Sequence, residues 1–178
     1  MNHPLHITIG KIIDEKSLPG CKILRDRACG GKQNIPLFPS KRKSRETEYC
    51  DVDILILKSS KIRVIMEIEE ADVKPTQICG KFLTSALSSY YIARDNNAVP
   101  MDNSVLFIQV LDTSKLKKDK TSKIKQWKNI EKSIRAIIPL RNSNIKEYIL
   151  FYGDVSEFGV NGEKRKELVD CILEFLSL

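Results

Sequence analysis

Two β-branched and leucine-rich runs, residues 51–58 and 62–69, follow one another with only a short polar turn between them. This pattern predicts two strands that pair as a β-hairpin, and their nearly continuous apolar character predicts burial on both faces. Asp53 lies at the start of the first run, and Glu67 and Glu69 close the second. Because residues two apart on a strand project from the same face, the three carboxylates are expected to meet at one end of the hairpin.

Carboxylates held close together repel one another unless a positive charge lies between them. A hard divalent cation with oxygen ligands is their usual partner. The chain carries a net charge of +7, with 30 lysine and arginine residues against 23 acidic residues. A cluster of acids in a basic chain indicates metal-assisted cleavage of a polyanion.

The length of 178 residues and the hydrophobic content of 42% fit a single domain, residues 1–178. No apolar run reaches the ~18–20 residues of a membrane span, and the N-terminus lacks a secretory signal pattern. The five cysteines are irregularly spaced, which favours reduced thiols. These features predict a cytoplasmic protein with no membrane association. His3 and His6 are predicted to be solvated or packing residues.

The rest of the chain is predicted to alternate between helices and strands. The predicted helices cover residues 5–17, 76–94, 122–138 and 162–176. Two further predicted strands cover residues 104–112 and 148–153. Residues 20–47 are predicted to form a long irregular connection, with an extended segment at 35–38. The order α-β-β-α-β-α-β-α predicts an α/β fold in which helices flank a mixed sheet.

Basic residues concentrate in the connection before the predicted hairpin. Those available to contact phosphates or guanine edges are Arg25, Arg27, Lys32, Lys41, Arg42, Lys43 and Arg45. Their position directly upstream of the acids favours a role in nucleic-acid binding. A second basic cluster, between Lys115 and Lys125, fits a solvated loop equally well.

The arrangement resembles the PD-(D/E)XK nuclease superfamily, which includes many type II restriction endonucleases and also repair and recombination nucleases. The superfamily pattern is an Asp, a gap of some ten to thirty residues, then Asp or Glu, any residue, and Lys. Asp53 matches the first acid and Glu67 the second, whereas Glu69 occupies the Lys position. The resemblance covers roughly residues 5–112 and implies a restriction-endonuclease-like fold.

What the resemblance implies is a Mg²⁺-dependent endonuclease that hydrolyses DNA phosphodiester bonds, with Mn²⁺ as an alternative ion. Asp53, Glu67 and the backbone carbonyl of Ile68 would hold the metal ion. Asp51 shares a face with Asp53 and is the alternative ligand; Asp53 is preferred because it directly precedes the apolar run. Glu69 would orient or deprotonate the attacking water, or help to bind a metal.

Further candidate site residues lie on the predicted helices. Lys81 or Lys74 would supply the positive charge that stabilises the transition state. Gln77 lies one turn before Lys81 and is similar to the helix-borne Gln of some superfamily nucleases. An acid of the first helix often completes such sites, with Glu15 and Asp14 as the alternatives here.

Restriction enzymes of this size usually act as homodimers on palindromic DNA, so a homodimer in a restriction system is the leading expectation. A non-catalytic nucleic-acid-binding protein on a nuclease-like fold is an alternative, favoured by the Glu at position 69. A repair nuclease or nuclease subunit that acts on branched or damaged DNA is another.

Overall fold

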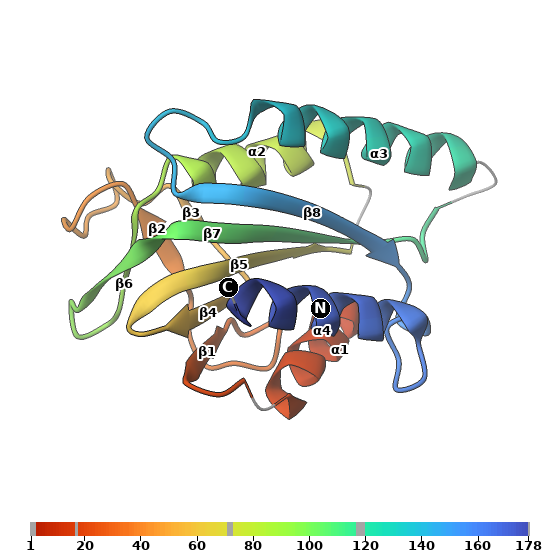
Figure 1. The fold of residues 1–178 in the computed structure, drawn as a ribbon, viewed down its shortest axis with the longest axis horizontal. Coiled ribbons are helices and arrows are strands. Elements are labelled where there is room, and N and C mark those ends of the chain that lie inside the picture. Colours follow the sequence, from red (N-terminus) through yellow and green to blue (C-terminus); the bar gives the residue numbers. More distant parts are fainter. Residues whose placement is uncertain (1–2, 17, 71–72, 117–119, 178) are drawn as a thin grey trace.

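The computed structural model describes residues 3–16, 18–70, 73–116 and 120–177. A mixed, mostly antiparallel β-sheet forms the middle layer, and two helices cover each of its faces (Figure 1). The helices are α1 (Pro4–Glu15), α2 (Pro75–Ala86), α3 (Lys120–Ile137) and α4 (Glu163–Ser177). The strands are β1 (Cys21–Arg25), β2 (Pro36–Phe38), β3 (Cys50–Asp51), β4 (Ile54–Lys58), β5 (Lys61–Glu69), β6 (Tyr90–Ile92), β7 (Ala98–Asp112) and β8 (Ile145–Gly153). The predicted α/β class with a mixed, helix-flanked sheet is confirmed.

Strands β4 and β5 form the predicted hairpin, with Ile54 opposite Met66 in an antiparallel register. Both residues of the turn at 59–60 have positive φ, which matches the twist of a two-residue hairpin turn to that of the strands. Continuing the register by one residue places Asp53 opposite Glu67. The acids therefore lie at the end of the hairpin away from its turn.

Strand β7 is central: it runs parallel to β5 on one side and parallel to β8 on the other. Its first residues pair antiparallel with β6, and β2 and β3 extend the sheet from there. Strand β1 closes the other edge beside β4. Parallel neighbours need crossover connections, and α2 and α3 lie in those crossovers. The parallel register sets Glu67 of β5 beside Gln109 of β7.

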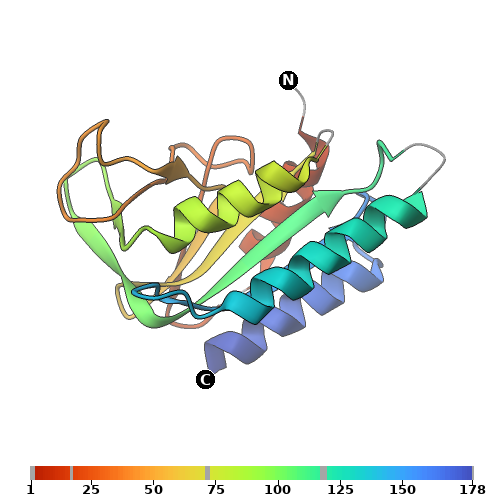
Figure 2. The same ribbon diagram turned by 90° about the horizontal axis from the view of Figure 1, so that it is seen from above.

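Alternate residues of the central strands pack into two different apolar layers. Ile65 and Phe107 belong to the layer under α2 and α3, whereas Met66 and Ile108 belong to the layer over α1 and α4. Figure 2, viewed from above, shows α2 and α3 lying across one face of the sheet. Burial on both faces explains why the strand sequences read as continuous apolar runs.

The structure contains strands that the predicted order lacks. Strand β1 lies in the segment 20–47 that was expected to be irregular; only Leu24 of β1 is buried, so its apolar pattern is weak. Strand β2 is the extended segment predicted at 35–38. The predicted strand 51–58 is interrupted at residues 52–53, which separates β3 from β4.

The predicted helix 76–94 ends earlier, and its last part forms strand β6. Tyr90 and Tyr91 fit helical spacing, but aromatic residues also suit strands, and here they pair with β2 and β7. The strand predicted at 104–112 begins at Ala98 because its first residues pair with β6. Pairing with β2, which is distant in sequence, and with β7 across a short turn overrides the local helical pattern.

All five cysteines are free, in agreement with the prediction of reduced thiols. Burial, followed by the charges of Asp53 and Asp26, raises the pKa of the Cys29 thiol, which therefore stays protonated. No helix among the described residues is both long and apolar enough to cross a membrane.

Helix α1 packs closely against the turn that follows β1, and Gly10 is the residue at the contact. A Cβ atom at position 10 would lie 2.2 Å from the carbonyl oxygen of Cys29. Gly80, in the middle of α2, offers a contrast because a Cβ atom there would meet nothing within 4 Å. The first glycine is required by packing and the second is not.

We expect the Gly10→Ala variant to lower the free energy of unfolding by about 1–3 kcal/mol, because α1 must move away from the turn. The matched Gly80→Ala variant is expected to be neutral or to stabilise the protein by up to about 1 kcal/mol, since alanine favours helix. Urea unfolding followed by circular dichroism measures both changes. Equal stability of the two variants would contradict the close contact at Gly10.

Candidate active site

The three acids predicted from the hairpin lie together at the end of β4 and β5. Glu67 and Glu69 project from the face of β5 that also carries Ile65, the face covered by α2 and α3. The side chain of Glu67 is fully buried, and those of Asp53 and Glu69 are each 13% exposed. The predicted convergence of these acids is therefore present in the fold.

Lys81 of α2 reaches the acids from above the sheet. Its Nζ donates a hydrogen bond to Glu67 Oε2 at 2.8 Å and lies 3.6 Å from Glu69 Oε1. Glu67 Oε1 is buried without a hydrogen-bond partner among the described residues. One ammonium group thus contacts two carboxylates and leaves an oxygen of the buried one without a partner.

The other candidates on α2 lie differently. Lys74 is exposed at the N-cap of α2, and its backbone N–H donates to Gln77 Oε1 at 2.8 Å. Gln77 is therefore used to cap the helix. Of the two lysines considered, the structure brings only Lys81 to the acids.

Asp53 is held by the main chain of the neighbouring strand. The backbone N–H of Ile68 donates to Asp53 Oδ2 at 2.6 Å, which sets the Ile68 main chain beside this carboxylate. Asp51, the alternative ligand, is exposed in β3 and pairs with Pro36 instead. His6 Nε2 lies 3.7 Å from Asp53 Oδ2 and supplies a further contact. Asp53, not Asp51, thus occupies the site.

Burial controls the ionisation of this cluster. It raises the pKa of Glu67 well above the usual value, and the charge of Asp53 adds to the effect while Lys81 opposes it. Burial also raises the pKa values of Asp53 and Glu69. Burial alone would lower the pKa of Lys81, but the charge and hydrogen bond of Glu67, with the charges of Asp53 and Glu69, together outweigh it, so the net shift is upward. Three carboxylates against one ammonium leave a charge imbalance that a divalent cation would correct.

The donor set fits a hard cation. Oxygen ligands from one or two carboxylates, with water in the remaining positions, are what Mg²⁺ prefers, and Mn²⁺ accepts the same ligands. Asp53 and Glu67 supply such oxygens side by side. The Ile68 carbonyl as a third ligand remains a prediction, as does the identity of the ion.

The acids of α1 do not reach the site. Asp14 pairs with Arg25 at 3.0 Å and Glu15 pairs with Arg165 at 2.7 Å, both at the C-terminal end of the helix. The N-terminal end of α1 contributes His6 instead. This role could not be predicted, because nothing in the local sequence pattern links His6 to a hairpin more than forty residues away.

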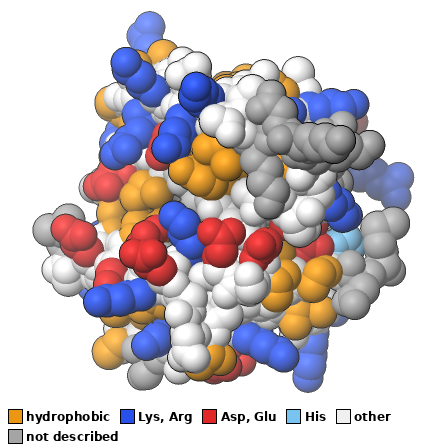
Figure 3. All heavy atoms as spheres, turned by 90° about the vertical axis from the view of Figure 1, so that its right-hand side faces the viewer, with side chains coloured by type: hydrophobic (Ala, Val, Ile, Leu, Met, Phe, Trp, Pro, Cys, Tyr) orange, Lys and Arg blue, Asp and Glu red, His pale blue; other side chains and the backbone are white. Residues whose placement is uncertain are grey.

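The end of the molecule at which β5, β7 and β8 finish carries mixed charge. Figure 3 faces this end and shows acidic side chains lying across it, with basic side chains among them and a histidine in view. Such a surface combines the negative groups that a cation needs with positive groups that a polyanion needs.

The predicted nucleic-acid-binding residues run from Arg25, the last residue of β1, along the chain towards β3. The guanidinium group of Arg25 forms an ion pair with Asp14 and donates hydrogen bonds to the carbonyls of Gly10 and Cys29. Arg27 and Lys43 line a cavity of about 320 Å³ together with Arg94, which the sequence analysis did not consider.

The other members of the basic set are exposed. They are Lys32, Lys41, Arg42 and Arg45. The loop between β2 and β3, which carries residues 41–45, projects on the left in Figures 1 and 2, whereas β5 ends towards the right of Figure 1. The N–H of Asp26, which lies between Arg25 and Arg27 in the chain, donates to the carbonyl of Asp53 at 2.8 Å. In the second basic cluster, Lys117 and Lys118 lie outside the described residues.

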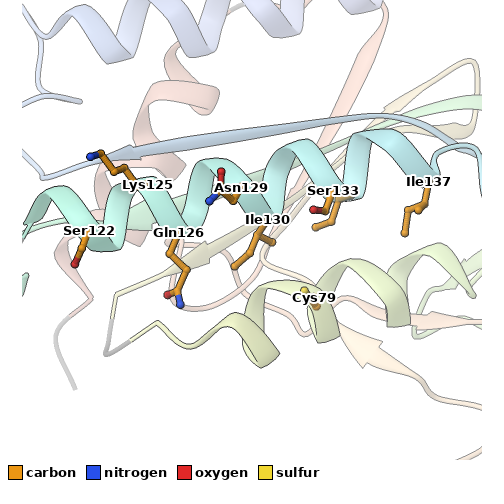
Figure 4. Close-up of a pocket in the computed structure, with 9 residues that line it drawn as sticks. Cys79, Ser122, Lys125, Gln126, Asn129, Ile130, Ser133 and Ile137 are labelled. Carbon is orange, nitrogen blue, oxygen red and sulfur yellow. The ribbon is translucent and has the colours of Figure 1, made fainter.

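A larger groove lies between α2 and α3, away from the acids. Its volume is about 620 Å³, and Figure 4 shows Ile130 and Ile137 of α3 facing it with Cys79 of α2. The lining is largely apolar, with Gln126 and Asn129 at its side. The groove contains none of the carboxylates and therefore does not belong to the candidate active site.

A second polar feature that the sequence analysis missed lies beside Glu67. Gln109 is fully buried, and its Oε1 accepts a hydrogen bond of 2.6 Å from the Tyr148 hydroxyl. The Tyr148 ring stacks on Phe107, which packs edge-on against Phe82 of α2. The sequence signal for this buried polar contact was the single glutamine within the apolar run of β7. An amide in such a run needs a buried hydrogen-bond partner. This buried layer adjoins the acids, since Gln109 lies beside Glu67 in the register of β5 and β7.

Comparison with known protein families, curated proteins and solved structures found no match to this chain. The resemblance to the PD-(D/E)XK superfamily accordingly remains a prediction from the residues.

The raised pKa of Glu67 predicts how the stability of the metal-free protein varies with pH. The folded chain keeps this proton to a higher pH than the unfolded chain, so stability falls as pH rises from 4.5 towards the raised folded pKa. In EDTA, the Glu67→Gln variant should melt higher than the wild type at pH 8 but not at pH 4. Thermal unfolding measures this difference.

Glu15→Gln, which removes an exposed carboxylate from α1, is the control and should follow the wild type at both pH values. A melting temperature of Glu67→Gln that tracks the wild type at every pH would contradict the raised pKa of Glu67.

Proposed function

We propose that the protein is a metal-dependent endonuclease that hydrolyses DNA phosphodiester bonds and has a restriction-endonuclease-like fold. The observation that carries the proposal is the convergence of Asp53, Glu67 and Glu69 with Lys81 at one end of the hairpin. The Lys81 ammonium group, carried by α2, supplies a positive charge at the site. The strand itself lacks that charge, because Glu69 occupies the Lys position of the superfamily pattern. The β4–β5–α2–β7 arrangement supports the same reading.

Asp53 and Glu67, with the Ile68 carbonyl, would hold Mg²⁺ or Mn²⁺. The bound ion would stabilise negative charge on the phosphate and lower the pKa of a water molecule. Glu69 would accept a proton from the attacking water, and the rise in its pKa through burial brings it closer to the value that a general base needs. Lys81 stays charged and would stabilise the charge that develops on the phosphate.

The positive residues would hold the DNA backbone. Arg27, Lys43 and Arg94 surround one cavity, and the exposed residues of the loop between β2 and β3 extend the positive surface outwards. Contacts of this type release counterions, so binding should weaken steeply with salt. We further propose a homodimer in a restriction system, since two-fold symmetry suits a palindromic site.

The proposal predicts that purified protein nicks or cuts supercoiled plasmid in Mg²⁺ and not in EDTA. Asp53→Asn and Glu67→Gln should each reduce cleavage by roughly 10²-fold or more, because the ion loses a ligand. Both should keep or improve DNA binding, because less negative charge faces the phosphates. Glu15→Gln, the carboxylate control distant from the site, should cut as the wild type does.

Gel electrophoresis of plasmid and phage DNA measures cleavage, and discrete phage fragments would indicate sequence recognition. Full activity in both acid variants would refute the site. Salt-sensitive DNA binding without any cleavage would favour the non-catalytic alternative.

Lys81 is expected to contribute to the chemical step. Lys81→Met should reduce single-turnover cleavage by about 10²–10³-fold, because the carboxylates and the phosphate lose their positive neighbour. Lys74→Met removes an exposed lysine from the start of the same helix and should have little effect on the rate. A similar loss in both variants would indicate that α2 contributes only general positive charge.

A further inference from the structure

Both histidines of the chain lie together with one carboxylate at the N-terminal end of α1. His3 Nδ1 is 3.5 Å from Glu70 Oε2, and His6 Nδ1 is 3.3 Å from Glu70 Oε1. The two imidazole rings are 5.1 Å apart, nearly edge to face. One ligand atom from each of the three side chains falls within 4.8 Å of the other two.

His6 has a buried nitrogen without a hydrogen-bond partner among the residues that the structure describes. The residue is 7% exposed, and its Nδ1 lies 3.3 Å from Glu70 Oε1 without forming a hydrogen bond within the described part of the chain. A buried polar atom without a partner is costly, so such an atom indicates a group that completes it. The His3 side chain is 37% exposed, which leaves one side of the cluster open to solvent.

We propose that His3, His6 and Glu70 form a binding site for Zn²⁺, separate from the Asp53–Glu67 site. Two ligand atoms at about 2.0–2.1 Å from a tetrahedral Zn²⁺ lie roughly 3.3–3.4 Å apart. Each histidine lies at a similar distance from Glu70, 3.5 Å for His3 and 3.3 Å for His6, and the ligand atoms of all three residues lie within 4.8 Å of one another. Imidazole nitrogen suits Zn²⁺ far better than Mg²⁺, whereas the oxygen-only set at Asp53 and Glu67 suits Mg²⁺. Three protein ligands leave a fourth position on the exposed side for water.

The carboxylate of this site is already fixed in place. Glu70 Oε1 accepts the backbone N–H of His6 at 2.8 Å, which anchors the end of β5 to the first turn of α1. The negative charge also offsets the positive end of the α1 dipole, which would otherwise oppose a cation there. Glu70 Oε2 remains directed towards His3.

The zinc site would be linked to the candidate active site through one imidazole ring. Coordination through Nδ1 of His6 requires its remaining proton to be on Nε2, and this nitrogen lies 3.7 Å from Asp53 Oδ2. A ligating histidine whose other nitrogen faces a carboxylate is a common support for zinc. Asp53 would then support zinc through His6 and hold the second ion directly.

The test uses the full-length protein with Zn²⁺ alone, in the absence of Mg²⁺. Competition with a chromophoric chelator measures affinity, and X-ray absorption at the zinc edge identifies the ligands. We expect one tightly bound Zn²⁺ with two imidazole ligands. Because the chain has only two histidines, imidazole scattering from both can come from this cluster alone.

Variants assign the zinc to its residues. His3→Ala and Glu70→Gln should each weaken zinc binding by at least about tenfold. Glu67→Gln should keep the wild-type affinity, as should Glu15→Gln at the other end of α1. His3→Ala is the safer variant for folding, since His3 is partly exposed and its side chain makes no capping hydrogen bond.

Two results would overturn the proposal: no zinc binding stronger than about 100 µM by the wild type, or binding that Glu67→Gln abolishes and His3→Ala preserves. Neither result depends on whether the protein cleaves DNA. Failure of the nuclease proposal and failure of the zinc proposal are thus separate outcomes.

Discussion

The contact between Lys81 and Glu67 is the interaction on which the arrangement of the site depends. A carboxylate that is wholly buried within a sheet is tolerated only when an opposite charge compensates for the lost hydration. Lys81 provides that compensation from α2, which fixes the rotation of the helix above β5. Ile78 and Phe82, on the same helix, can then enter the apolar layer between α2 and the sheet. One ion pair thus couples the charge of the strand to the packing of the helix.

The hairpin could be predicted from sequence because both of its strands are strongly apolar and are joined by a tight turn. The alternation of β5 also placed Glu67 and Glu69 on one face, and the choice of Asp53 over Asp51 agrees with their exposure. These features follow from local periodicity. The resemblance to a nuclease, in contrast, is inferred from the same residues, and the fold is compatible with it.

Other parts of the site depend on contacts between distant segments. The approach of His6 to Asp53, the pairing of β1 with β4 and the position of Arg94 beside Arg27 and Lys43 are set by how the helices and edge strands assemble. The local sequence pattern does not predict any of these three contacts. Strand β6 shows the limit clearly, because Tyr90 and Tyr91 satisfy helical spacing and yet pair as a strand.

Strand β3, which joins the loop at residues 41–45 to Asp53, limits how far movement of the loop reaches the acids. The N–H of Tyr49 donates to the carbonyl of Leu37, and the N–H of Val52 donates to the carbonyl of Ile35, so both ends of β3 are fastened to β2. A force on the exposed loop before β3 is therefore transmitted to β2 and not along the chain to Asp53. Contact of the loop with a partner would therefore leave the Asp53 carboxylate in its place.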